Sequence, residues 1–162
     1  MKKTVLALVL VLCFSSTIMY AQLKTSPGDI VSKDNASIDL VKAIFENSFY
    51  DVTETAASYI KIKDTYGIYI DLDKDNRYLT LSVNWPINDN FSSQDKFLLL
   101  NKIGKDVLVV TPYYNEGGTS LIVKTTAWIE GGSTVKNIVM TEKIFVKALN
   151  LILDKDTQKI IK

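Results

Sequence analysis

The spacing of apolar residues changes several times along the chain, and each change marks a new element. After Ala36 the apolar positions recur at intervals of three and four, which places them on one stripe of a helix. A helix is therefore expected to begin near Ser37. Asp34, Asn35 or Ser37 can cap its first turn by accepting backbone N–H bonds. The residues on the stripe are Ile38, Val41, Ile44, Phe45 and Phe49.

The period then becomes two, which predicts half-buried antiparallel strands. Three such segments follow one another, separated by turn-forming sequences at residues 64–67 and 73–76. Pro86 ends the third segment, because proline has no N–H to donate to a sheet ladder. The apolar positions are Ile60 and Ile62, then Ile68, Ile70 and Leu72, and finally Leu79, Leu81, Val83 and Trp85.

A second helix is expected after these strands. Ser92 or Ser93 starts it. Asp95 stands where a capping box places its acidic residue, and Gly104 is a typical helix end. Apolar residues occupy more than one side of this helix, so the pattern predicts deep burial. They are Phe97, Leu98, Leu99, Leu100 and Ile103.

The last third of the chain predicts a hairpin and a long helix. Strands are expected near Val107–Tyr114 and Thr119–Glu130, because the residues between them, 115–118, form a hairpin-turn sequence. A final helix follows from about Thr134 to Leu153, and the charged tail Asp154–Lys162 is expected to fray. The helix carries Val135, Ile138, Val139, Phe145, Leu149 and Ile152 on one side.

The expected elements therefore run in the order α-β-β-β-α-β-β-α. Helices that are segregated from an antiparallel meander sheet are typical of the α+β class. Residues 37–162 are expected to form a single domain, because this length suffices for one hydrophobic core and is short for two. Residues 22–36 are polar and contain the turn pair Pro27-Gly28, so they are predicted to be a linker.

The first 21 residues have the layout of an export signal. Lys2 and Lys3 precede the apolar run Val5–Phe14, and a small, polar stretch ends at Ala21. A run of about ten apolar residues is too short to span a bilayer, which needs about 20. We therefore expect cleavage after Ala21 and an exported protein, either periplasmic or secreted. The Ala-Gln ending resembles signal peptides of Bacteroidetes, which favours a Gram-negative envelope.

The composition of the chain after this segment argues against several kinds of catalytic and metal-binding chemistry. The chain has no histidine, and its one cysteine, Cys13, falls within the predicted signal. The exported part therefore lacks the usual proton shuttle, soft metal ligands and a thiol nucleophile. Taking Lys2 and Lys3 from the 19 basic residues leaves 17 against 18 acidic ones, a net charge of −1 that gives no reason to expect nucleic acid. The sequence favours a protein that is not an enzyme and uses no cofactor and no metal.

Acidic residues alternate at Asp71, Asp73 and Asp75, as at the start of a calcium-binding loop. The sixth and twelfth positions of such a loop require glycine and glutamate, but here they are Asn76 and Ser82. A polar hairpin tip explains the same residues, because Asp and Asn tolerate turn geometry. The hairpin interpretation is favoured, and a calcium loop is the alternative.

Four large residues fall on the side of the predicted strands opposite the apolar face: Tyr69, Tyr78, Ile122 and Trp128. If that face is open, it presents an aromatic and aliphatic patch larger than a monomer normally exposes. Tyrosine and tryptophan are favoured at the energetic centres of protein interfaces. A terminal helix or the N-terminal segment is the alternative cover for this face. The patch is therefore a candidate binding surface.

Several features together carry a family resemblance. They are the helix block Lys96–Lys105 between two sheet segments, the strand pair Gly67–Leu72 and Tyr78–Val83, and the hairpin Val107–Ile129 before an apolar last helix. In this pattern residues 37–153 resemble the YbjN family, whose members are labelled bacterial regulators of sensory transduction and whose fold is similar to that of type III secretion chaperones. The resemblance implies a compact domain that binds protein, with a homodimer as one possible state, and it carries over no catalytic residues. The export signal is a departure, because type III chaperones are cytoplasmic.

Two functional hypotheses are consistent with these features. The first is an exported, non-enzymatic protein-binding module with a regulatory or chaperone-like role, whose partner is another protein or a second copy. The second is an envelope carrier or sensor that holds a small apolar molecule between the sheet and the helices. A carrier is expected to purify with a bound apolar molecule or to gain thermal stability when one is added.

Overall fold

The computed structural model describes residues 23–162, and the expected export signal lies outside the described residues. The described chain is an α+β domain, which confirms the expected fold class and order of elements. In chain order the elements are β1 (Ile30–Val31), α2 (Ile38–Asn47), β2 (Asp51–Thr55), β3 (Tyr59–Lys63), β4 (Gly67–Leu72), β5 (Tyr78–Pro86), α3 (Ser93–Asp106), β6 (Thr111–Tyr114), β7 (Ser120–Trp128), β8 (Ser133–Thr134) and α4 (Val135–Lys155). No helix among residues 23–162 is long and apolar enough to cross a membrane.

The main sheet has the strand order β2-β3-β4-β5-β7-β6, and every neighbouring pair is antiparallel. Strands β2 to β5 form a meander, and the β6–β7 hairpin extends it with its second strand next to β5. The pairing of β5 with β7 runs from Tyr78 opposite Trp128 to Pro86 opposite Ser120. Besides the two-residue strands β1 and β8, strand β2 is additional to the expected strands. Its sequence, DVTET, lacks the apolar alternation that would predict it, and an irregularity between Val52 and Glu54 interrupts its pairing.

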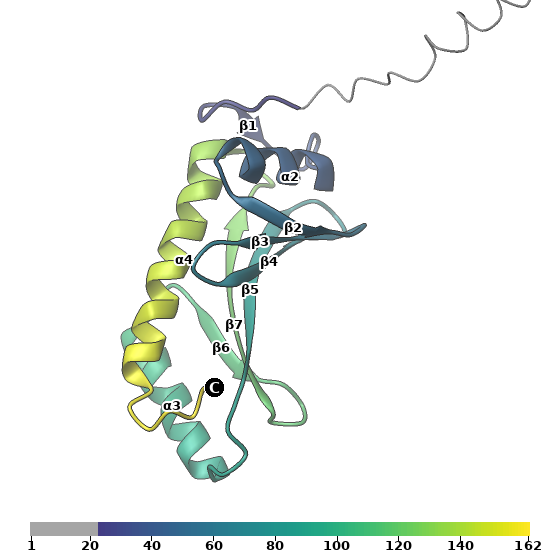
Figure 1. Ribbon diagram of the computed structural model, residues 1–162. Helices are drawn as coiled ribbons and strands as arrows, with labels where there is room; N and C mark the ends of the chain where they lie inside the picture. Colours follow the sequence, from purple (N-terminus) through teal and green to yellow (C-terminus); the bar gives the residue numbers. More distant parts are fainter. Residues whose placement is uncertain (1–22) are drawn as a thin grey trace, which may run out of the picture.

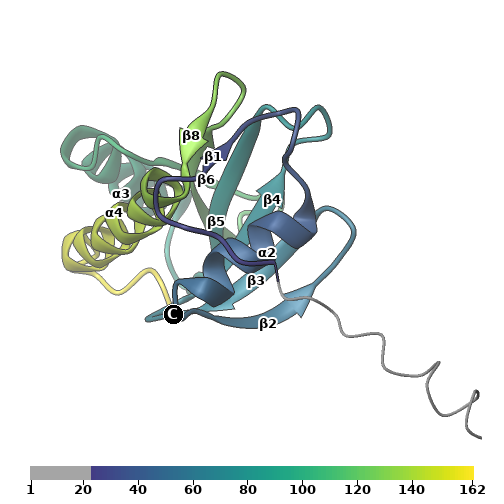
Figure 2. The ribbon, with the colours of Figure 1, turned by 90° about the horizontal axis from the view of Figure 1, so that it is seen from above.

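The helices lie on one side of the strongly twisted sheet. Helix α4 runs along that side, with α2 over one end of the sheet and α3 at the other, as Figures 1 and 2 show. Between these layers lies one core of buried apolar side chains. Its largest members are Phe45, Phe145, Ile44, Ile60, Ile62, Ile68, Ile70, Leu79, Leu81, Ile87, Ile103 and Leu121.

Helix α2 begins as expected and ends earlier than its apolar stripe suggests. Ser37 caps it, with its side-chain oxygen accepting a hydrogen bond from the backbone N–H of Leu40. The helix ends at Asn47 in a Schellman motif, in which the N–H of Tyr50 reaches the carbonyl of Phe45. Phe49, expected on the buried stripe, instead occupies the left-handed position of this motif with φ = 66° and is 99% exposed.

Replacing Phe49 with glycine should raise the free energy of unfolding by about 1 kcal/mol, because left-handed backbone is strained for a residue with a Cβ and easy for glycine. No buried surface is lost, since the side chain is already in solvent. Urea denaturation of Phe49→Gly and Phe49→Val measures this effect, with the β-branched valine expected below wild type. Equal stability of the two variants would contradict a strained site.

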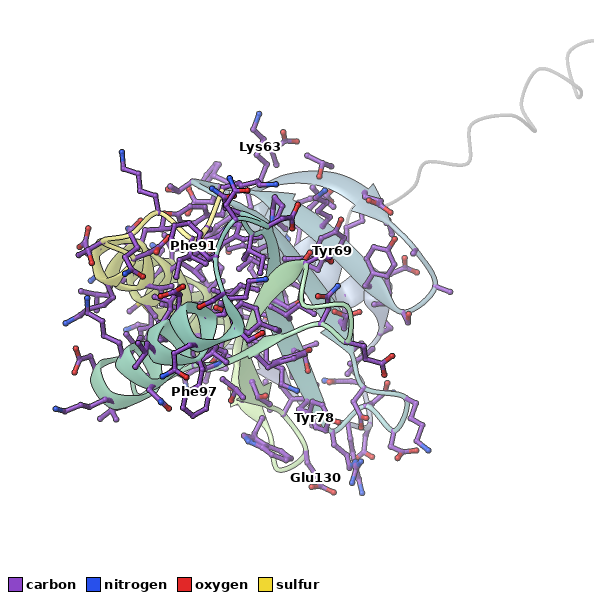
Figure 3. All side chains as sticks on the ribbon, turned by 90° about the horizontal axis from the view of Figure 1, so that it is seen from below. Lys63, Tyr69, Tyr78, Phe91, Phe97 and Glu130 are labelled. Atoms are coloured by element: carbon purple, nitrogen blue, oxygen red, sulfur yellow. The ribbon has the colours of Figure 1, made fainter. Side chains whose placement is uncertain are left out.

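Helix α3 is not deeply buried, so the sequence-based expectation for it is wrong. Leu99 and Ile103, one turn apart, reach the core, while Phe97 and Leu98 are 57% and 54% exposed. The helix packs beside the short edge strand β6 at the end of the sheet, so only one side of it meets other elements. Figure 3 shows Phe97 pointing away from the molecule. The capping box between Ser92 and Asp95 is present as expected.

Helix α4 carries the expected stripe in the core, capped by Thr134. The tail after it is tied down rather than frayed. Both carboxylate oxygens of Asp156 accept backbone N–H bonds, at 2.9 Å from Ile160 and 2.7 Å from Ile161. These two isoleucines are 1% and 9% exposed. The tail therefore completes the core beside the end of β5, where Ile161 pairs with Ile87 in an isolated bridge.

The segment expected as a polar linker is part of the fold in its described portion. Strand β1 pairs with β8 just before α4, and Val31 is 1% exposed. Further back, the Asn47 side chain donates a 2.8 Å hydrogen bond to the carbonyl of Leu23. The polar composition of this segment did not indicate that it packs against the domain, because only a few of its residues, Val31 and Ala36 among them, make the buried contacts.

Candidate binding face

Strand alternation gives the main sheet one apolar side, which the helices cover, and one polar side, which no element among residues 23–162 covers (Figure 1). We call this second side the open face. Of the two arrangements left open by the sequence, the exposed one is therefore present in the described chain. The open face includes Tyr59, Lys61, Tyr69, Asp71, Tyr78, Thr80, Ser82, Asn84, Thr111, Tyr113, Ile122, Lys124, Thr126 and Trp128.

At one end of the open face Tyr78 and Trp128 are directly opposite each other on β5 and β7. Their ring centroids lie 5.2 Å apart in an edge-to-face arrangement. The guanidinium of Arg77 lies 5.8 Å from the Tyr78 ring, and Trp128 is 65% exposed. An indole this exposed is held in place by its cross-strand partner and still offers most of its surface to another molecule.

A second cluster lies on β3 and β4. Tyr69 packs edge-to-face against Tyr59 at 5.8 Å between ring centroids, and the ammonium of Lys61 lies 4.8 Å from the centre of the Tyr69 ring. Tyr59 donates a hydrogen bond to Glu54 on the neighbouring strand β2, which fixes its ring. Figure 3 shows Tyr69 and Tyr78 at separate places on the side of the sheet away from α4.

The third cluster lies on the β6–β7 hairpin. Ile122 pairs across the strands with Tyr113, whose ring has the ammonium of Lys124 at 5.3 Å from its centre. Tyr113 is 39% exposed. A cation over an aromatic face is attracted electrostatically by the ring, which stabilises this pairing of Lys124 with Tyr113.

The side chains of β5 in the middle of the open face are small and polar. Ser82 on β5 lies opposite Tyr69 on β4 and opposite Lys124 on β7. One row across these three strands therefore presents an aromatic ring, a hydroxyl and an ammonium group. Thr80 lies on the same face two residues from Ser82 and opposite Asp71. Burial raises the pKa of the Asp71 carboxyl above its ordinary value. Aromatic clusters around a centre of hydrogen-bonding side chains suit the surface of another protein better than a small molecule.

The four residues singled out from the sequence therefore share one face but do not form one cluster. Tyr78 and Trp128 are brought into contact, whereas Tyr69 and Ile122 each belong to a separate group. Sequence reasoning missed Tyr59 and Tyr113. Tyr59 directly precedes the buried Ile60 in its strand, so the alternation of side chains could have placed Tyr59 on the open face. Tyr113 lies in a short strand of sequence TPYY, in which two adjacent tyrosines leave the phase ambiguous.

The acidic turn between β4 and β5 forms a hydrogen-bonded hairpin tip. Asp73 accepts a bond of 3.1 Å from the guanidinium of Arg77, which also lies 3.6 Å from Asp75. Asn76 adopts φ = 57° and donates its side-chain amide to the carbonyl of Ala36. No group of three or more potential metal-ligating side chains occurs among residues 23–162.

Comparison with known proteins identifies a similar fold but no match to a family model or to a curated sequence. No protein-family model matches the chain. No curated protein matches its sequence. The structure is similar to the crystal structure of YbjN from E. coli, which is provisionally described as a transcription regulator. That similarity has a TM-score of 0.68 at 10% sequence identity and covers 82% of this chain and 98% of YbjN.

The chain therefore has a YbjN-like fold, as its pattern of elements led us to expect. At this identity the similarity extends to the fold and not to individual site residues. The open face must be judged by its own chemistry.

Proposed function

We propose that this YbjN-like domain is an exported, non-enzymatic module that binds another protein through its open face. The observation that carries the proposal is the open face itself, with Trp128 paired to Tyr78 yet 65% exposed. Exposed aromatic residues on a rigid scaffold lose little conformational freedom on binding, which is why they dominate interface energetics. A regulatory role would agree with the provisional description of E. coli YbjN as a transcription regulator.

Export is supported by the sequence. Lys2 and Lys3 before the apolar run Val5–Phe14 are typical of a cleaved signal. The rest of the chain has no cysteine and no histidine, so its stability and its binding rest on packing and hydrogen bonds. Mass spectrometry can identify the N-terminal residue of the protein isolated from a native envelope or culture fraction. This measurement tests whether the predicted export signal is cleaved.

The alternative hypothesis places an apolar ligand between the sheet and the helices. In the described chain that space is filled by side chains with exposures near zero, such as Phe45, Phe145 and Ile138. A site for a small molecule is therefore expected outside the core.

Replacing Tyr69, Tyr78 and Trp128 together with alanine should abolish capture of the partner while leaving the fold intact. Each of these side chains lies on the open face, outside the core, and interface aromatics typically lose tenfold or more in affinity, about 2 kcal/mol each, when truncated. The test is cross-linked affinity purification of the tagged protein from its native fraction, compared between wild type and the triple variant.

The matched control is a variant of the helical side, Lys147→Ala, which removes an exposed side chain far from the open face. It should capture the partner as wild type does. Capture that survives the triple substitution would count against binding through the open face.

A further inference from the structure

A groove with a volume of about 470 Å³ lies outside the core, between the end of α2, the first turns of α4 and the N-terminal segment. Its apolar wall consists of Pro27, Val135, Val139 and Met140, and the side chains of Lys136 and Lys143 also line it. This volume is within the range of small-molecule sites, which are mostly apolar with a few polar groups that fix orientation. The groove is separate from the open face, so a ligand bound there would be independent of the protein-binding function proposed for that face.

Hydrogen bonds attach the N-terminal segment to both helices that border the groove. The backbone N–H of Lys136 donates to the carbonyl of Pro27 at 2.9 Å, which fastens the N-terminal segment to the start of α4. On the other side, the Asn47 amide donates to the carbonyl of Leu23 at 2.8 Å and to the hydroxyl of Thr25 at 3.1 Å. Because these backbone and amide groups are already satisfied, the apolar wall and the lysines are what remain for a ligand.

The charge at the groove has one sign. No acidic residue lines it, and neither Lys136 nor Lys143 lies within 4.0 Å of a carboxylate among residues 23–162. The two lysines are seven residues apart, about 10.5 Å along a helix, so their long side chains can converge on one anion between them. The apolar wall next to them would be in contact with whatever that anion is attached to.

We propose that this groove binds a small amphiphile with an anionic head, of the class of free long-chain carboxylates. The two ammonium groups hold the carboxylate, and the apolar wall takes the hydrocarbon chain. Burial of each CH₂ of such a chain is favourable, and the paired lysines fix its direction.

Titration of the purified domain with decanoate, read by calorimetry and by amide NMR shifts, tests the proposal. Saturable binding with shifts on α4 near Val139 and on α2 near Ser48 is expected. Decyltrimethylammonium, which has the same chain and the opposite charge, should bind at least about tenfold more weakly, since its head is repelled where the carboxylate is held.

Variants make the test specific. Lys136→Gln with Lys143→Gln should weaken decanoate binding by about tenfold. Met140→Glu should abolish it, because a carboxylate then occupies the apolar wall. Lys147→Gln, an exposed lysine of the same helix outside the groove lining, is the matched control and should bind as wild type.

Three results would overturn the proposal. The first is absence of saturable binding by decanoate. The second is equal binding of the cationic and anionic amphiphiles, or binding unaffected by the lysine and Met140 variants. The third is binding to vesicles of anionic phospholipid, or to an acidic amphipathic peptide, without binding of free decanoate.

Discussion

Deleting residues 157–162 should lower the free energy of unfolding by about 3–5 kcal/mol, because two nearly buried isoleucines leave the core. Ile160 is 1% exposed and Ile161 is 9% exposed. The deletion also strips the Asp156 carboxylate of both its backbone N–H donors, at 2.9 and 2.7 Å, and leaves a charge without partners in a site that is 8% exposed.

Chemical denaturation of the truncated and full-length proteins measures this loss. Gln158→Ala is the control within the same tail, since its side chain is exposed and should change stability by less than about 0.5 kcal/mol. A truncated protein as stable as the full chain would show that the tail is only loosely attached.

Replacing Tyr50 with phenylalanine should cost about 1–3 kcal/mol, because it leaves a buried acid without its only hydrogen-bond partner among residues 23–162. Glu142 of α4 is fully buried, and its Oε2 accepts a 2.5 Å bond from the Tyr50 hydroxyl. Its Oε1 has no partner in the described chain. Tyr59→Phe is the matched control, because it removes a similar tyrosine-to-carboxylate bond at an exposed site and should change stability little.

The double variant Tyr50→Phe with Glu142→Leu should recover much of that loss. Removing both members of a buried polar pair leaves no unsatisfied group, whereas removing one leaves the other buried and unpaired. If the double variant were as unstable as Tyr50→Phe or less stable, the cost would lie in packing and not in the unpaired carboxyl.

The same pair makes stability depend on pH. Burial raises the pKa of Glu142 above its ordinary value of 4.5, and the Asp64 carboxylate adds to this against the opposing effect of the Tyr50 hydrogen bond. The folded state therefore binds the proton more tightly than the unfolded chain. This contribution to stability is complete below the ordinary carboxyl range and decreases as the pH rises through the folded pKa. Glu142→Gln, which cannot ionise, should flatten this dependence in denaturation measured across that range.

The apolar periodicity predicted most of the fold because most elements bury a regular side. The stripe of α4 and the alternation in β3, β4 and β5 are all found in the core. Strand β2 escaped prediction because it lies at the edge and its side chains are mostly exposed, so no alternation was required of it. Phe49 was misplaced because spacing alone does not reveal where a helix ends.

The candidate site was predictable in part for a related reason. The alternation of side chains along each strand assigns four residues to one face, but it does not show which of them are neighbours. They are Tyr69, Tyr78, Ile122 and Trp128. Which of them are neighbours depends on register between strands distant in sequence, such as the pairing of Tyr78 with Trp128. The groove beside α4 and the buried Glu142 depend on tertiary contacts between α2, α4 and the N-terminal segment, and no local pattern encodes those.

Site-specific photocross-linking tests the proposed function most directly. A photoreactive residue placed at Thr126, exposed on the open face between Trp128 and Lys124, should cross-link to a partner protein in the native fraction. The same residue placed at Asn137, exposed on α4, should not. Cross-links from Asn137 with none from Thr126 would contradict the proposal and move the protein-binding surface to the helical side.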